Sequence, residues 1–157
     1  MQDQVFIAEQ LVPLPRETVF DFFSEPRNLE AITPPWLGFH IVDRSTSAIE
    51  EGTELTYRLR IRGVPVTWRS RISEWQPNER FVDVQLKGPY TKWHHTHSFH
   101  DRGSATLIRD RVLYRLPLGL LGHWVAGRFV AADVEKIFAF RAAKTDELLM
   151  RCAEDGP

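Results

Sequence analysis

Apolar residues follow two different periods along the chain, and these periods predict its secondary structure. Seven short segments either alternate apolar with polar residues or are rich in β-branched residues, which is typical of strands with one buried face. Glycine, proline and small polar residues separate most of these segments, as turns require. We therefore predict seven strands, over residues 5–14, 39–44, 53–62, 66–75, 81–87, 93–100 and 105–116.

Helical periodicity occurs in three places. An apolar stripe of one valine and three phenylalanines predicts a short helix over residues 15–23, with Pro15 in the first turn, where its missing N–H would have no partner. A second short helix is predicted over residues 28–32, because the prolines that follow stop it. Near the C-terminus, apolar residues recur at spacings of three and four, which predicts one amphipathic helix over about residues 119–150. At ~1.5 Å per residue this helix is long enough to cross a whole sheet.

This order of elements predicts an α+β fold in a single domain that spans residues 1–157. Strands joined by tight turns form antiparallel sheets, because parallel pairs need long crossovers. We expect a strongly curved, seven-stranded antiparallel sheet wrapped around the long C-terminal helix, with two short helices after the first strand. A cavity remains if that helix does not fill the concave face.

Composition excludes several classes of partner. Twenty basic and 21 acidic residues give a formal charge of −1, so there is no general attraction to nucleic acid or to anionic membranes. No apolar run is long enough to span a bilayer, and no secretory signal is visible, so we expect a cytoplasmic protein without stable membrane insertion. Cys152 is the only cysteine, which excludes an intrachain disulfide and argues against a thiolate zinc site.

Four of the six histidines lie within residues 94–100, in one predicted strand. Alternation places Trp93, His95, His97 and Phe99 on one face of that strand. Buried imidazole nitrogens need hydrogen-bond partners, so this aromatic face suits the wall of a ligand cavity better than a dry core.

The neighbouring strands offer acidic partners for these histidines. If Arg102 and Gly103 form a two-residue turn, His95 lies opposite Asp110 on the next strand. On the other side, a short connection pairs Asp83 with His95 and leaves the alternate positions Val82, Val84 and Leu86 facing outward. The resulting hypothesis is an inward polar cluster of Asp83, His95 and Asp110, with His97 and Gln85 nearby.

Several short motifs resemble the SRPBCC superfamily, which includes START domains, birch-pollen-allergen-like proteins and polyketide cyclase/dehydrases. The resemblance covers nearly the whole chain, and its aromatic-histidine strand is similar to a bacterial subgroup of ligand-binding proteins. It implies the helix-grip fold and a cavity for lipids, sterols, polyketides or hormones, while a few members are cyclases. The motifs are residues 15–23, 26–29, 80–83, 88–90, 93–99, 116–119 and 137–141.

Three functions are compatible with this pattern. The first is binding of a small, mostly hydrophobic molecule of lipid, polyketide or aromatic type between sheet and helix. The second is a cofactor-independent cyclase or dehydratase that uses His95 and Asp110 as an acid/base pair. The third is a non-catalytic interaction module that forms a homodimer through Val82, Val84 and Leu86. The predicted ligand-binding residues are Trp68, Asp83, Gln85, Trp93, His95, His97, Phe99, Asp110, Val112, Tyr114, Trp124, Phe138 and Arg141.

Two residue types leave alternatives open. Arg141 interrupts the apolar stripe of the long helix, and it either holds a ligand carboxylate or extends to the cavity rim. His95 and His97 form a His-x-His pair that could chelate a metal with a carboxylate, as in jelly-roll cupins, for which Asp101 has nearly the right spacing. The second cupin motif is missing, so we expect polar cavity lining, with no metal and no cofactor.

Overall fold

A curved antiparallel sheet and a long helix form the frame of the protein. The computed structural model describes residues 3–117 and 120–155, with the side chains of residues 120–126 outside this description. The sheet has the strand order β1-β7-β6-β5-β4-β3-β2. Its strands are β1 (Gln4–Val12), β2 (His40–Arg44), β3 (Glu54–Ile61), β4 (Val64–Gln76), β5 (Arg80–Lys87), β6 (Lys92–Asp101) and β7 (Thr106–Arg115).

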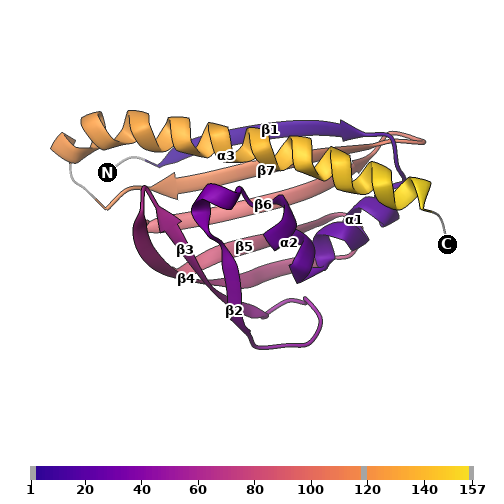
Figure 1. Cartoon of the computed structure of the whole chain (residues 1–157), viewed down its shortest axis with the longest axis horizontal. Helices are drawn as coiled ribbons and strands as arrows, with labels where there is room; N and C mark the ends of the chain where they lie inside the picture. The colour runs from indigo at the N-terminus through magenta and orange to yellow at the C-terminus, as the bar shows by residue number, and fades with distance from the viewer. Residues whose placement is uncertain (1–2, 118–119, 156–157) are drawn as a thin grey trace.

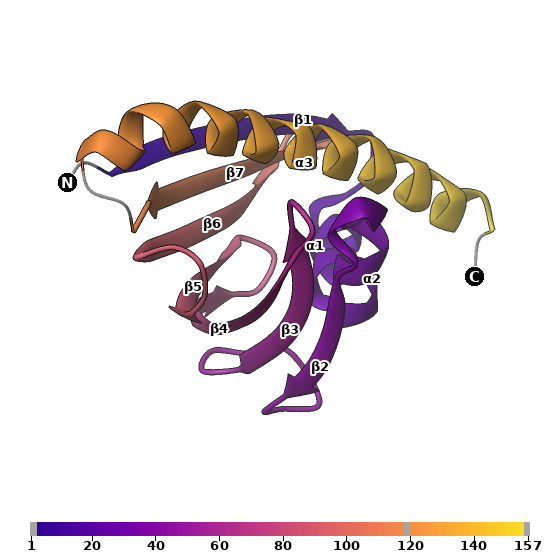
Figure 2. The ribbon, with the colours of Figure 1, turned by 60° about the vertical axis from the view of Figure 1, so that its left-hand side comes forward.

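Helix α3 (Leu120–Glu154) runs along β1 and β7, while the sheet curves away from it towards β2 (Figures 1 and 2). The amide of Gln10 in β1 donates a hydrogen bond to the carbonyl oxygen of Ala142 in α3, at 2.8 Å. This arrangement confirms the predicted fold, a seven-stranded sheet with a long C-terminal helix. No helix among the described residues is long and apolar enough to cross a membrane.

Two short helices, α1 (Arg16–Ser24) and α2 (Pro26–Ile32), close the space between the far part of the sheet and α3 (Figure 2). Glu25 separates them: its carboxylate accepts a hydrogen bond from the N–H of Arg27, at 3.4 Å, and Pro26 occupies the first position of α2. A single turn of 3-10 helix, η1 (Pro35–Leu37), follows where the sequence predicted only a helix stop.

The described apolar core is divided into two clusters. One surrounds Phe20 of α1, and the other surrounds Val112 of β7 and Phe138 of α3. Along β6, Phe99 belongs to the first cluster and Trp93 packs on the second. The two inward histidines lie between these positions, so polar groups occupy the middle of the interior.

The β6–β7 register differs from the predicted one by two residues. The connection contains four residues, because the strands separate after the pair Asp101–Thr106. Asp101 stabilises this longer turn by accepting a hydrogen bond from the N–H of Gly103, whose φ of +76° favours glycine. His97, rather than His95, therefore lies opposite Asp110. A shift of two residues preserves the faces, so Asp110 still points inward.

The predicted outward strip on β5 is only partly exposed. Val82 is 4% exposed and Val84 is half-buried, so only Leu86 is exposed to solvent. The register of β4 against β5 shifts between Ile72 and Glu74, and the hydroxyl of Ser73 donates to the carbonyl oxygen of Val82. The bulge interrupts the regular outer face beside Val82. The three residues therefore do not form the continuous apolar surface that the sequence suggested.

Candidate functional site

A cavity of about 450 Å³ lies between the concave face of the sheet, the short helices and α3. Most of its wall is aromatic or aliphatic, and strands β3 to β6 all contribute. The aromatic lining residues are Phe22, Phe23, Trp36, Phe39, Tyr57, Trp68, Phe81, Tyr90, Trp93 and Phe138.

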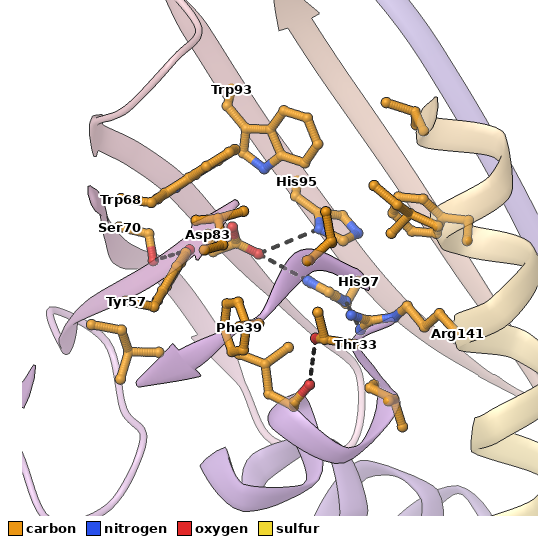
Figure 3. Close-up of a pocket in the computed structure, with 18 of the residues that line it drawn as sticks. Thr33, Phe39, Tyr57, Trp68, Ser70, Asp83, Trp93, His95, His97 and Arg141 are labelled. Carbon is orange, nitrogen blue, oxygen red and sulfur yellow. Dashed lines mark hydrogen bonds and ion pairs between the residues drawn. The ribbon is translucent and has the colours of Figure 1, made fainter. Parts of the chain in front are cut away.

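One side of this apolar cavity carries a cluster of four charged or titratable groups. His97 lies between two carboxylates, with Nε2 2.9 Å from Oδ2 of Asp83 and Nδ1 3.0 Å from Oδ1 of Asp110. His95 places Nε2 2.8 Å from the same Oδ1 of Asp110, and its Nδ1 lies 3.5 Å from Oδ2 of Asp83. Figure 3 shows Asp83 reaching toward both histidines across the cavity wall.

Sheet pairing explains why these groups meet. Strand β6 lies between β5 and β7, and its alternation points both His95 and His97 inward. Asp83 pairs with His95 from β5, as predicted, and Asp110 pairs with His97 from β7. Each carboxylate then reaches the second histidine diagonally, which is within range for neighbouring strands.

Burial and hydrogen bonding set different protonation states for the two histidines. Burial, followed by the neighbouring charge of His97, lowers the pKa of His95 below its usual value of 6.5. Burial also acts to lower the pKa of His97, but hydrogen bonds to Asp110 and Asp83 outweigh it and raise that pKa. Of the two histidines, His97 is therefore the one that holds a second proton more strongly.

Both carboxyl groups are held in the charged form. Burial acts to raise the pKa of Asp83, but the hydrogen bond from His97 and the nearby positive charges outweigh it and lower that pKa. For Asp110, hydrogen bonds from His95 and His97 outweigh burial and hold the pKa well below its usual value of 3.8.

Arg141 extends from α3 toward this cluster (Figure 3). A terminal guanidinium nitrogen lies 3.5 Å from Nδ1 of His97, and the group lies over the rings of Phe23 and Phe138, at 5.4 and 5.9 Å. Its Nε is buried and has no hydrogen-bond partner among the residues that the structure describes. Of the two alternatives for Arg141, the side chain takes the inward one.

The structure places twelve of the 13 predicted ligand-binding side chains, and they differ in their relation to the cavity. Seven of them line the cavity: Trp68, Asp83, Trp93, His95, His97, Phe138 and Arg141. Asp110 lies behind the histidines, beside a small void next to β1 and α3, and contacts the cavity only through them. The side chain of Trp124 lies outside the described residues.

The other four predicted residues do not line the cavity but make contacts within the core or with a loop. Phe99 packs between Phe20 and Phe23 in the first core cluster, and Val112 and Tyr114 belong to the second. The side chain of Gln85 turns to the β5–β6 connection, where its amide donates to the carbonyl oxygen of Tyr90, at 2.6 Å. Their inward direction was readable from alternation, but the sequence does not show how far the cavity extends along each strand.

Sequence reasoning did not include Tyr57 of β3 among the site residues. Its hydroxyl donates to Ser70 of β4, at 3.0 Å, on the cavity wall near Asp83 (Figure 3). Burial and the charge of Asp83 raise the pKa of Tyr57, so the phenol keeps its proton. The sequence feature that could have identified Tyr57 as a site residue was its position between Leu55 and Leu59, which share its inward face.

Charged residues mark the mouth of the cavity. Arg62, at the β3–β4 turn, forms a two-fold ion pair with Asp133 of α3, at 2.9 and 3.0 Å. Lys136 of α3 lies 4.8 Å from the ring centre of Trp36 in η1. These contacts join α3 to the opposite side of the cavity.

A family model described as "Polyketide cyclase / dehydrase and lipid transport" matches residues 12–140. The chain belongs to this family. The match and the structural neighbours confirm the predicted SRPBCC membership and helix-grip fold. No curated protein sequence matches the chain significantly.

Solved structures with low sequence identity share the fold of this family member. The Zhui aromatase/cyclase from Streptomyces sp. R1128 is similar with a TM-score of 0.77 and 14% identity, over 96% of this chain and 95% of that one. Norcoclaurine synthase from Thalictrum flavum, solved with dopamine and hydroxybenzaldehyde, gives 0.71 and 13%, over 96% and 88%. A START superfamily protein from Mycobacterium smegmatis gives 0.65 and 16%, over 92% and 98%.

Proposed function

We propose that this protein binds a small, mostly apolar molecule of lipid, polyketide or aromatic type in the cavity beneath α3. The observation that carries this proposal is an aromatic-lined cavity of about 450 Å³ with the cluster of Asp83, His95 and His97 on one part of its wall. Its volume lies within the range of about 300–1,000 Å³ that is typical of small-molecule sites. Apolar contacts supply most of the affinity, at about 25 cal/mol per Å² removed from water.

The charged side of the cavity orients the ligand. The Nε of Arg141 is a buried donor with no protein partner among the described residues, and His95 and His97 present their edges beside it. A polar oxygen on the ligand would satisfy the Nε of Arg141, whereas a wholly apolar ligand would leave this nitrogen unpaired. We therefore expect one polar end, bound near Arg141, and an apolar or aromatic body against Trp68 and Trp93.

Related proteins support this class of ligand. The family description includes lipid transport, and the norcoclaurine synthase complex contains two small aromatic molecules. The many aromatic rings of the present cavity suit such flat molecules, because offset and edge-to-face ring contacts add to area burial.

Native mass spectrometry and an apolar probe test the proposal together. We expect a small molecule to co-purify with the chain, and anilinonaphthalene sulfonate to bind with one molecule per cavity. Leu59→Trp fills the cavity from β3 and should weaken probe binding at least about tenfold, or about 1.4 kcal/mol. Val64→Trp is the matched control, because Val64 is 62% exposed on the same hairpin and does not line the cavity. Equal binding by both variants would contradict the proposal.

A second candidate function is acid–base catalysis in the same cavity. One observation favours it: Nε2 of His95 lies 2.8 Å from Oδ1 of Asp110. Because a carboxylate accepts hydrogen bonds, the proton of neutral His95 belongs on Nε2, and Nδ1 is then an unprotonated base on the cavity wall. Benzoylacetone in heavy water tests this, because a base would exchange its acidic C–H protons for deuterium. We expect exchange above background with the wild type, its loss in His95→Gln and its retention in His100→Gln. No exchange by the wild type would eliminate this candidate.

A homodimer, a cytoplasmic location and a single domain over residues 1–157 stay predictions from the sequence. Size-exclusion chromatography tests the dimer, and a clean monomer would eliminate the interaction module as a function.

A further inference from the structure

We propose that Asp83, His95 and His97 bind a divalent transition-metal ion of the zinc or ferrous class on the wall of the cavity. Each residue offers one ligand atom, and the three atoms lie within 4.8 Å of one another. All three side chains line the cavity, so the remaining coordination positions of the ion would face the ligand space. This inference concerns residues of the chain itself and does not depend on which organic ligand the cavity holds.

The spacing of the donor atoms suits a metal ion. Ligand atoms about 2.1 Å from a tetrahedral zinc ion lie about 3.4 Å from one another. In the structure, Oδ2 of Asp83 lies 3.5 Å from Nδ1 of His95 and 2.9 Å from Nε2 of His97. In the metal-free chain a proton between Asp83 and His97 takes the place of the ion, so binding requires only small movements of these side chains.

Asp110 provides the second and sharper argument. Metal-binding histidines usually donate their other ring N–H to a carboxylate, which fixes the ring orientation. Here one oxygen of Asp110 lies 2.8 Å from Nε2 of His95 and 3.0 Å from Nδ1 of His97, which are the nitrogens not directed at Asp83. The far side of both rings is thus held by a carboxylate, and the near side of both is directed to one point beside Asp83. A His–Asp pair that only stabilises the fold needs a carboxylate on one side of the ring, whereas here both rings have one on each side.

The chemistry of the donors selects the class of ion. Two imidazoles and one carboxylate suit Zn²⁺, Fe²⁺ or Mn²⁺, whereas Mg²⁺ and Ca²⁺ prefer oxygen ligands and Cu⁺ prefers sulfur. The charges of Asp83 and Asp110 balance a divalent ion, and Arg141 adds a positive charge beside His97. The loaded site therefore favours an anionic oxygen of the cavity ligand at an open coordination position.

The sequence argued against a metal because the second cupin motif is missing, and the acid near the cupin spacing was Asp101. That residue lies at the exposed end of β6, in the turn to β7. The strand pairing brings Asp83 to the histidines instead, from a strand whose register the sequence does not fix.

Metal titration of the full chain tests the proposal. Cys152 is exposed and could bind metal by itself, so the titrations use a Cys152→Ser background stripped with a chelator. We expect one Zn²⁺ per chain by isothermal titration calorimetry, and a Co²⁺ complex with visible absorption bands typical of a nitrogen and oxygen ligand set. Asp83→Asn, His95→Gln and His97→Gln should each abolish stoichiometric binding. Asp110→Asn keeps all three ligands and should weaken binding about 10–100-fold.

His100→Gln is the matched control, since His100 lies on the same strand but is exposed. Circular dichroism and binding of anilinonaphthalene sulfonate show whether each variant is folded. The proposal is overturned if the wild type binds no stoichiometric ion, or if the ligand variants bind as the control does. Either result leaves probe binding in the cavity unchanged, so failure of the metal site is distinguishable from failure of the proposed function. A bound ion would occupy Nδ1 of His95, so this site and acid–base catalysis by that nitrogen exclude one another.

Discussion

The imidazole rings of His95 and His97 lie almost on top of one another, with centroids 3.6 Å apart and an angle of 33° between their planes. Two imidazolium cations at this distance would repel strongly in a buried site, so at most one ring is charged in the metal-free protein. The carboxylates select His97, because both of its nitrogens face an acceptor. When this ring is protonated, it and Arg141 balance the charges of Asp83 and Asp110.

Asp110→Asn should lower the free energy of unfolding by about 3 kcal/mol, because it leaves buried imidazoles without their shared carboxylate. Urea unfolding with a chelator present measures the change. Asp146→Asn is the control, since Asp146 is exposed on α3 and should change stability by less than about 0.5 kcal/mol. A loss below about 1 kcal/mol for Asp110→Asn would show that the cluster is not a coupled buried network.

The pH dependence of stability should follow the opposite shifts of these groups. The pKa of His97 is raised in the folded state, so its contribution is fully present below the usual 6.5 and is lost as pH rises through the raised value. The pKa of Asp110 is depressed, so its contribution is present above the usual 3.8 and is lost as pH falls through the lower folded value. His95, whose pKa is lowered, adds a loss of stability as pH falls below 6.5.

The contribution of His97 to stability can be isolated by comparing the wild type with a variant that lacks this histidine. We expect the difference in unfolding free energy between wild type and His97→Gln to decrease as pH rises above 6.5, when both are measured with a chelator. His100→Gln should give a difference that does not change in this way. A difference that is constant across this range would mean that His97 does not bind its extra proton in the folded state.

Much of the fold could be predicted because alternation is a strong signal in this chain. All seven strands and the long helix lie within four residues of their predicted ends, and the inward faces of β5, β6 and β7 follow from side-chain period alone. The β6–β7 register could not be predicted, because a hydrogen bond from the N–H of Gly103 to the carboxylate of Asp101 stabilises the longer turn. The predicted register was wrong by two residues, an even number, so Asp110 kept its inward direction and still contacts His95.

The cavity wall was less predictable than the strand faces. Phe22 and Trp36 reach it from α1 and η1, and the docking of such short elements depends on long-range packing that no local pattern encodes. Phe99 and Tyr114 face inward as predicted, but side chains of the short helices and α3 fill the space next to them. A period-2 pattern identifies which side chains point inward, but it does not tell which of them meet an empty volume.

Tryptophan quenching should locate a ligand within the cavity. A medium-chain fatty acid with a terminal bromine quenches only those tryptophans that it contacts. We expect strong quenching in the wild type, most of which is lost in a Trp68→Phe, Trp93→Phe double variant, because both rings line the cavity. Trp75→Phe is the control, since Trp75 packs against Phe20 and Phe81 in the first core cluster. Quenching that disappears with Trp75 instead would place the ligand elsewhere.

The ion pair between Arg62 and Asp133 should control ligand exchange more than stability. Both side chains are well exposed, at 58% and 38%, and such surface pairs contribute at most about 1 kcal/mol to folding. Figure 2 shows the β3–β4 turn close to α3. The ion pair joins these two elements and both of its residues line the cavity, so we expect the pair to open when the mouth widens. Loss of about 1 kcal/mol from the closed state would speed release about fivefold.

Stopped-flow release of anilinonaphthalene sulfonate measures this effect. We expect faster dissociation for Arg62→Ala and for Asp133→Asn, a smaller difference from wild type at high salt, and a melting temperature close to that of the wild type. Arg58→Ala is the matched control, because Arg58 is exposed on β3 and does not line the cavity. An exchanged pair, Arg62→Asp with Asp133→Arg, should restore slow release if attraction between these two side chains closes the mouth. Unchanged release rates in both single variants would mean that ligands leave by another route.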